Sequence, residues 1–305
     1  MCLIAFALNV HNACPLLLAS NRDEFWARPT QPLSRWQLPG GATVYGGRDL
    51  KAGGTWLGFS ENGRVAMLTN GRNGEPDVAP RSRGELVTRW LAGPAVTPDW
   101  PALPQACRGS DYGGFNLLLG DIHQQSWVWL SNRADPARAA DGTRPLGSGW
   151  IGRTLSPGIY GLSNAGLDTP WPKTRRLKQA IAQALSAWTT EVAPASPTSE
   201  PVWQAMLRTA LLDRQPAADH ELPDTGIPLT REQQLSSPFV HMPEVGYGTR
   251  SSLIAHWAIH AGGGQLHLDE WTHNPSGSQA SSTHRRLSMS TWGMPTSSYS
   301  SPTTA

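Results

Sequence analysis

The chain has 305 residues, with 25 Lys or Arg against 23 Asp or Glu and a formal net charge of +2. It contains no block of Lys and Arg that would follow a nucleic-acid backbone or an anionic membrane surface, which argues against nucleic acid as a partner. This length allows one large domain or two ordinary ones with a substantial buried core. Its 14 Trp, 31 Gly and 26 Pro predict a turn-rich chain of many short strands packed by large aromatic side chains.

Four pairs of apolar runs bounded by turn residues predict β-hairpins. Residues 2–9 and 16–21 form the first, and the second strand delivers Asn21-Arg22-Asp23-Glu24 at its end. Residues 55–60 and 64–70 flank Asn62-Gly63, the strongest short hairpin turn in the chain. The remaining two pairs are residues 115–121 with 126–132, and 251–261 with 265–271.

Helices are fewer and lie between the strand-rich ends. Residues 82–85 have the spacing of a capping box ahead of an apolar run, which predicts a helix start. Apolar residues repeat every four positions over 177–188, and residues 202–211 indicate a third helix. This order favours an α+β fold with a layered sheet core over a doubly wound sheet.

From about residue 275 the chain is rich in Ser and Thr and almost free of aliphatic residues. Such a segment lacks the apolar surface that offsets the entropy of ordering. We therefore expect one folded domain over 1–274 and a disordered tail over 275–305.

The three cysteines, Cys2, Cys14 and Cys107, are odd in number and have no C-x-x-C spacing, which argues against a disulfide framework and a structural zinc site. The first twenty residues carry no basic leader and are interrupted by polar residues, so they predict strands and not a signal peptide. No apolar run approaches the roughly 20 residues that span a bilayer. We expect a cytoplasmic protein without a metal and without an integral membrane segment.

Cys2 is the first candidate for chemistry. Removal of Met1 would put a thiol and a free α-amine on one residue, and their ordinary pKa values of about 8.5 and about 7.7–8.0 let them exchange a proton near neutrality. At the end of the adjacent strand, Asp23 would hydrogen-bond the α-ammonium or orient the thiol, and Arg22 would stabilise the thiolate. The alternatives are a small residue at a strand start and a solvated surface turn.

Further segments strengthen the functional interpretation when taken in order along the chain. They are residues 1–4, 21–24, 46–58 (GGRDLKAGGTWLG), 82–86 (SRGEL), 113–121 (GGFNLLLGD), 160–173 (YGLSNAGLDTPWPK) and 248–252 (GTRSS). Together they resemble the NRDE-motif family, also called the transport and Golgi organisation protein 2 family, which is grouped with the N-terminal nucleophile hydrolases. The resemblance covers about the first 270 residues and implies a four-layered αββα sandwich.

A more distant similarity is to the cysteine N-terminal nucleophile acylases of the bile-salt hydrolase and penicillin V acylase type. It implies that Cys2 is the nucleophile. It also implies that Asp23 takes the place of the aspartate that stands shortly after the second strand of these enzymes. It also implies that Asn70 and Asn164 bind the substrate or the tetrahedral intermediate, and that Arg250 is the late arginine. Arg22 matches less well, because the arginine of the acylases stands further before the aspartate. Both asparagines also suit turns, and Arg250 also suits a surface strand.

Three functions remain open at this point. The leading hypothesis is a hydrolase or acyltransferase, without a cofactor, that acts on a non-peptide C–N (amide) bond of a small molecule. The alternative, which the family resemblance implies, is a haem-binding or haem-trafficking protein that reuses the fold without catalysis. That haem would be bound non-covalently, because no C-x-x-C-H exists, with nine His, six Met and three Cys as candidate ligands. The third is a non-catalytic scaffold.

Overall fold

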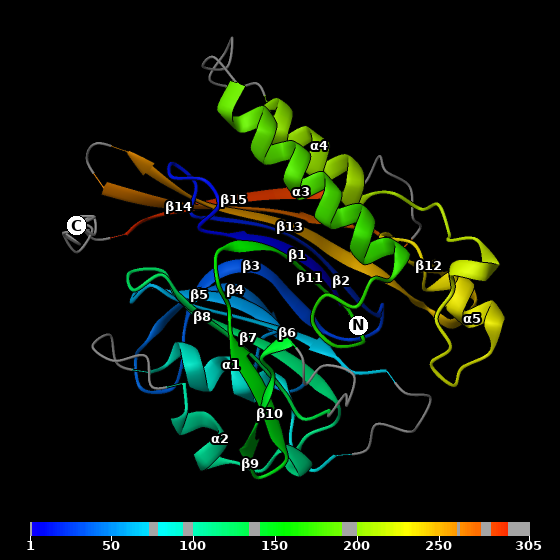
Figure 1. Ribbon diagram of the computed structural model, residues 1–305, viewed down its shortest axis with the longest axis horizontal. Coiled ribbons are helices and arrows are strands. Elements are labelled where there is room, and N and C mark those ends of the chain that lie inside the picture. The colour runs from blue at the N-terminus through cyan, green and yellow to red at the C-terminus, as the bar shows by residue number, and fades with distance from the viewer. Residues whose placement is uncertain are drawn as a thin grey trace, which may run out of the picture.

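The computed structural model describes residues 2–72, 79–93, 100–133, 141–190, 200–260, 263–275 and 282–291. Two antiparallel sheets lie face to face, and helices cover the outer face of each (Figure 1). The α+β class and the αββα layering predicted above are therefore confirmed.

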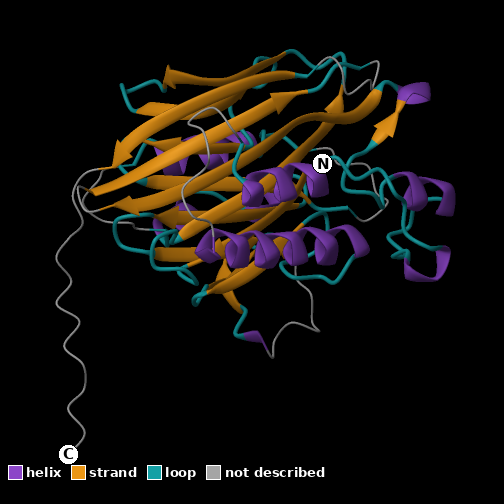
Figure 2. Ribbon diagram, turned by 90° about the horizontal axis from the view of Figure 1, so that it is seen from above, coloured by secondary structure: helices purple, strands orange, loops and turns teal. Residues whose placement is uncertain are grey.

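The first sheet contains the strand that begins at Cys2. Its order is β11 (Gly158–Leu162), β1 (Cys2–Leu8), β2 (Leu16–Phe25), β13 (Tyr247–His260), β14 (Gly263–Thr272) and β15 (Thr283–Thr291), and the short β12 (His241–Met242) pairs with β13. On its outer face pack α3 (Pro172–Thr190) and α4 (Val202–Leu211), which lie across the strands in Figure 2.

The second sheet is formed mainly by the middle of the chain. Its order is β3 (Thr30–Gln37), β4 (Thr43–Asp49), β5 (Leu57–Ser60), β6 (Arg64–Asn70), β7 (Phe115–Asp121), β8 (Ser126–Ser131), β10 (Trp150–Thr154) and β9 (Arg144–Gly147). Its outer face packs against α1 (Gly84–Leu91) and α2 (Ala102–Ala106). The short α5 (Leu229–Gln234) lies beside β12 at one end of the molecule (Figure 1).

β1 explains why the chain starts with an unbroken apolar run. Alternate residues of a strand point to opposite faces. Ile4 and Phe6 therefore enter the core between the sheets, while Leu3 and Ala5 pack against the α3–α4 layer. A strand buried on both faces needs apolar residues at every position, and this fixes Cys2 firmly at the edge of the core.

Two sequence predictions need correction. The predicted disordered tail is wrong over Thr283–Thr291, because β15 pairs with β14 through nine residues; the rest of that tail lies mostly outside the described residues. An edge strand needs only a few apolar contacts, and Met289 supplies one to the core between the sheets. The predicted capping box is also wrong: Arg83 is the N-cap of α1 and makes no side-chain capping hydrogen bond, and Glu85 pairs with Arg81 and Arg89.

Two glycines bring remote motif segments into direct backbone contact. A Cβ atom added to Gly54 would lie 2.7 Å from the carbonyl carbon of Gly84, and one added to Gly84 would lie 3.0 Å from the carbonyl oxygen of Thr55. Real Cβ atoms essentially never show a contact under 3.0 Å, and a contact of 3.0 Å is tighter than most. The glycines thus allow the start of α1 to close against the loop between β4 and β5.

Candidate active site

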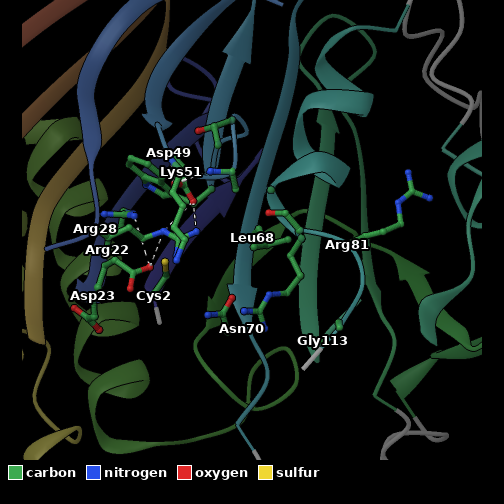
Figure 3. Close-up of a pocket in the computed structure, with 18 of the residues that line it drawn as sticks. Cys2, Arg22, Asp23, Arg28, Asp49, Lys51, Leu68, Asn70, Arg81 and Gly113 are labelled. Carbon is green, nitrogen blue, oxygen red and sulfur yellow. Dashed lines mark hydrogen bonds and ion pairs between the residues drawn. The ribbon is translucent and has the colours of Figure 1, made fainter. Parts of the chain in front are cut away.

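A cavity of about 580 Å³ opens at the ends of β1, β2 and β6 and is closed on one side by the start of α1. Figure 3 shows Cys2 in it, with Arg22, Asp23 and Arg28 on one side and Asn70 on the other. The charged and catalytically apt residues among its described lining are Cys2, Arg22, Asp23, Glu24, Arg28, Asp49, Lys51, Asn70, Arg81 and Arg83. The structure thus brings together four of the six predicted site residues.

Cys2 is the first residue of β1 and lies directly opposite Arg22 on β2. Its side chain is 8% exposed, and its carbonyl oxygen accepts a hydrogen bond of 3.3 Å from the Ser163 hydroxyl. Burial raises the pKa of the Cys2 thiol, with a further increase from the Asp23 carboxylate, while Arg22 acts in the opposite direction. The thiol is therefore neutral near pH 7 and needs a proton acceptor before it can act as a nucleophile.

The Asn-Arg-Asp-Glu segment lies within β2, which continues to Phe25, and not in a solvated turn. The alternation of the strand separates its side chains. Arg22 shares the face of Cys2, whereas Asn21 and Asp23 point toward the helix layer. Asn21 Nδ2 donates to the carbonyl oxygens of Leu211 (2.7 Å) and Pro238 (2.9 Å), so this asparagine joins β2 to the end of α4 and does not line the cavity.

Arg22 is held by packing more than by hydrogen bonds. Its guanidinium lies 4.1 Å above the Trp56 ring, its side chain is 6% exposed, and Glu24 is 3.7 Å away. Glu24 is shared with Arg28, whose Nη2 lies 2.6 Å from Asp49. Among the described residues, Arg22 Nη1 is buried and has no hydrogen-bond partner.

Asp23 is 1% exposed, and its Oδ1 accepts a hydrogen bond of 2.7 Å from the Thr249 hydroxyl. Burial raises its pKa, and the strongest opposing influence is the ammonium of Lys173. Lys173 lies in the first turn of α3 and is itself 2% exposed. Burial lowers the pKa of Lys173 to about 8, while the charges of Asp23 and Cys2 act to raise it. Lys173 is not predicted from the sequence, because nothing in the local pattern marks a lysine at a helix start as buried.

The two predicted asparagines have different places. Asn70, at the end of β6, is partly exposed and lines the cavity. Asn164 is 1% exposed, and its Nδ2 donates to the Asn70 carbonyl oxygen at 2.9 Å. Asn164 is absent from the described lining and instead fixes the strand end that carries Asn70.

Arg250 is not brought to the cavity lining among the described residues. A β-bulge between Thr249 and Ser251 takes it out of the β2–β13 ladder. Its Nη1 then donates to the carbonyl oxygens of Phe25 (3.0 Å), Trp26 (3.0 Å) and Arg28 (3.1 Å). Arg250 thus holds the turn between β2 and β3, and its catalytic role stays a prediction.

Other candidate centres are weaker. Cys14 and Cys107 are free and buried, and burial raises the pKa of Cys14 to about 12. No group of three or more His, Cys, Asp or Glu in the described ranges could hold a metal ion. Within those same ranges, no helix is long and apolar enough to cross a membrane.

Comparison with known proteins places the chain in a family. The family model for Transport and Golgi organisation 2 matches residues 1–266. The Transport and Golgi organization protein 2 homolog of Homo sapiens is 32% identical over 273 residues, covering 83% of this chain and 87% of the human protein. The Drosophila melanogaster Transport and Golgi organization protein 2 is 28% identical over 274 residues, with the same coverage of both chains.

Among solved structures, the N-acylethanolamine-hydrolyzing acid amidase ortholog of Caenorhabditis elegans aligns over 83% of this chain and 91% of its own, with a TM-score of 0.42 and 10% identity. A variant of conjugated bile acid hydrolase from Clostridium perfringens aligns over 96% and 98%, with a TM-score of 0.39 and 9% identity. These values are too low to assign a role to any residue. The match to the family model and the identity to its members establish that the chain belongs to the Transport and Golgi organisation 2 family.

Proposed function

We propose that the chain is an N-terminal-cysteine hydrolase or acyltransferase that acts on a non-peptide C–N (amide) bond of a small molecule. The observation that carries the proposal is the position of Cys2 at the start of a fully buried strand, in a cavity lined by Arg22, Asp23 and Asn70. A nucleophile on a rigid strand is positioned better than one on a mobile terminus.

Removal of Met1 would supply the missing proton acceptor. The neutral α-amine of Cys2 would take the thiol proton as Sγ bonds to the amide carbonyl carbon and the π electrons move to the oxygen. The C–N bond would then break as the α-ammonium returns the proton to the leaving amine, which leaves a thioester on Cys2. Water, or an acceptor amine or alcohol in acyl transfer, would attack the thioester and regenerate the thiol.

Neighbouring residues suit these steps. Asp23 would hold the α-ammonium, and the positive charges of Lys173 and Arg22 oppose protonation of that amine and so keep a fraction of it neutral. The Asn70 amide is the cavity-lining donor for the developing oxyanion, a role worth about 3–4 kcal/mol in other enzymes. Asn164 acts on the site through Asn70.

The test combines mass spectrometry with a panel of small N-acyl amides. Protein from its native host should lack Met1, and incubation with a substrate should add the acyl mass to Cys2. Cys2→Ala should abolish turnover, whereas Cys107→Ala should retain it. Retention of Met1, or equal turnover by Cys2→Ala, would sink the mechanism.

The alternative of haem binding without catalysis stays a prediction. The described residues that line the cavity include neither His nor Met, so Cys2 is the ligand that this cavity offers to haem iron. A haem titration on wild type and Cys2→Ala, followed by Soret absorbance, runs beside the amide panel. A saturable shift in wild type without turnover would favour the alternative, and its loss in Cys2→Ala would place the haem in this cavity.

A further inference from the structure

We propose that the cavity contains a subsite for an oxyanionic group, a carboxylate or a phosphate, held by Arg22 beside Cys2. The subsite rests on the proposed function in that it names the substrate class of the same cavity: an amide that carries an anionic group near the bond to be cleaved. Binding to the subsite requires no turnover, so the two proposals can fail separately.

The first support is the hydrogen-bonding state of Arg22. Its side chain is 6% exposed and lines the cavity, yet its Nη1 has no partner among the described residues. Glu24, at 3.7 Å, is beyond hydrogen-bond distance and also serves Arg28. A buried guanidinium N–H that lacks an acceptor is costly, and a ligand oxyanion in the cavity is the acceptor that would satisfy it.

The second support is the charge of the cavity lining. It contains five cationic side chains and three carboxylates. Two of the carboxylates, Glu24 and Asp49, are engaged by Arg22 and Arg28, while the third, Asp23, faces the buried Lys173. Lys51 also lines the cavity and makes no ion pair with any described residue. Its positive charge is therefore one that a bound anion would balance.

The third support is the pairing of Arg22 with Cys2. Residues directly opposite in antiparallel strands have Cβ atoms about 4.5–5.5 Å apart. Trp56 beneath the guanidinium keeps the arginine from turning away. An anion on Arg22 therefore lies close to the carbonyl that Cys2 would attack, and not at the far end of the substrate.

Binding is measured by calorimetry on full-length Cys2→Ala protein, which cannot turn the probes over. The probes share one acyl chain: N-hexanoylglycine carries a carboxylate, N-hexanoyl-O-phosphoethanolamine a phosphate, and N-hexanoylglycinamide is neutral. We expect at least one anionic probe to bind about 10-fold or more tightly than the neutral one. The preference should shrink between about 50 and about 300 mM NaCl, and the better anionic probe identifies the group.

Arg22→Gln in the same background should bring the affinities of anionic and neutral probes together. The matched control is Arg35→Gln, an exposed arginine of β3 that pairs with Glu61 and is absent from the described lining; it should leave the preference unchanged. Since Arg22 packs on Trp56 and its loss risks misfolding, Lys51→Gln, an exposed change, provides a second variant and should weaken the anionic probes several-fold.

Equal affinities for all three probes, or no binding of either anionic probe, would overturn the subsite. So would an Arg22→Gln protein, folded by circular dichroism, that loses affinity for anionic and neutral probes by the same factor. If anionic amides bind with the expected preference but wild type does not cleave them, the proposed function fails and the subsite stands.

Discussion

Lys173 and Asp23 carry opposite charges at a place where neither side chain is more than 2% exposed. Each acts on the pKa of the other, Lys173 lowering that of Asp23 and Asp23 raising that of Lys173. Glu232, the other carboxylate that acts on Lys173, already bonds to Arg72 at 2.8 Å. Asp23 is thus the carboxylate that most stabilises the buried ammonium of Lys173. The protonation of the two groups next to Cys2 therefore depends on one residue from β2 and one from α3.

Replacement of Lys173 by Met should change how stability depends on pH. Because burial lowers the pKa of Lys173 from 10.5 to about 8, the unfolded chain keeps a proton in this range that the folded chain has lost. This lysine therefore adds about 3 kcal/mol to the free energy of unfolding as the pH rises from 8 to 10.5. Urea unfolding of wild type and Lys173→Met across this range should show the difference between them growing in favour of wild type. A difference between wild type and Lys173→Met that stays constant across this range would contradict the assignment.

Asn70 and Asn164 should separate into a catalytic and a positioning residue. Asn70→Ala removes a partly exposed side chain from the cavity, so kcat/KM should fall about 100- to 1000-fold while the free energy of unfolding changes by less than about 1 kcal/mol. Asn164→Ala leaves the Asn70 carbonyl without its donor and should destabilise the fold by about 1–3 kcal/mol. Chemical unfolding and steady-state kinetics on both variants check this. A loss of stability for Asn70→Ala equal to that of Asn164→Ala would show that both are structural.

Asn21 should matter for folding and not for binding. Asn21→Ala leaves two carbonyl oxygens without a donor, and it also removes the Oδ1 that accepts a bond of 2.6 Å from Ser252. We expect a loss of about 2–3 kcal/mol in the free energy of unfolding. At a temperature where the variant is folded, Asn21→Ala in the Cys2→Ala background should bind the anionic probes as tightly as Cys2→Ala alone. A selective loss of anionic binding would instead place Asn21 in the cavity.

Arg250→Met should loosen the turn between β2 and β3. The variant loses three bonds to carbonyl oxygens of this turn, so hydrogen exchange at the backbone amides of Trp26 and Arg28 should become faster. Arg250→Lys retains one cationic donor and should show a smaller change. Unchanged exchange in Arg250→Met, together with a shift in the pH profile of turnover, would support the catalytic assignment instead.

The sequence predicts the inner strands well because a strand buried on both faces needs an unbroken apolar run. β1 and β7 (Phe115–Asp121) are buried along their whole length and are apolar almost throughout. Edge strands carry no such signal. β3 contains Pro32 and a register shift between Gln31 and Ser34, features that edge strands tolerate, while β15 is largely polar. These edge strands are held in place by backbone hydrogen bonds to their neighbours. Such bonds impose no periodic pattern of apolar residues on the sequence.

The residues of the candidate site likewise fall into those that the sequence predicts and those that it does not. Cys2, Arg22 and Asp23 can be predicted because each stands at the start or end of an apolar run, and such ends meet at one edge of the core; Asn70 is indicated only by the resemblance to the cysteine acylases. Arg250 lies outside the described lining because a single-residue bulge takes it out of the β2–β13 ladder, and no local pattern indicates that bulge. Lys173 is missed because its burial is a property of the packing of α3 on the first sheet.

Because the backbones of Gly54 and Gly84 are in contact, a mutation at either glycine should affect the same contact between two segments that are remote in the sequence. An alanine at Gly54 forces the start of α1 away from the β4–β5 loop, an alanine at Gly84 presses on the Thr55 carbonyl oxygen, and Gly84 itself lines the cavity. Neither loss can be rescued by a smaller residue at the other position, because both are already glycine. In a genetic screen, suppressors of a change at one glycine should therefore map elsewhere than the other, and alanine should be tolerated less well at Gly54 than at Gly84, because its Cβ would come closer to backbone.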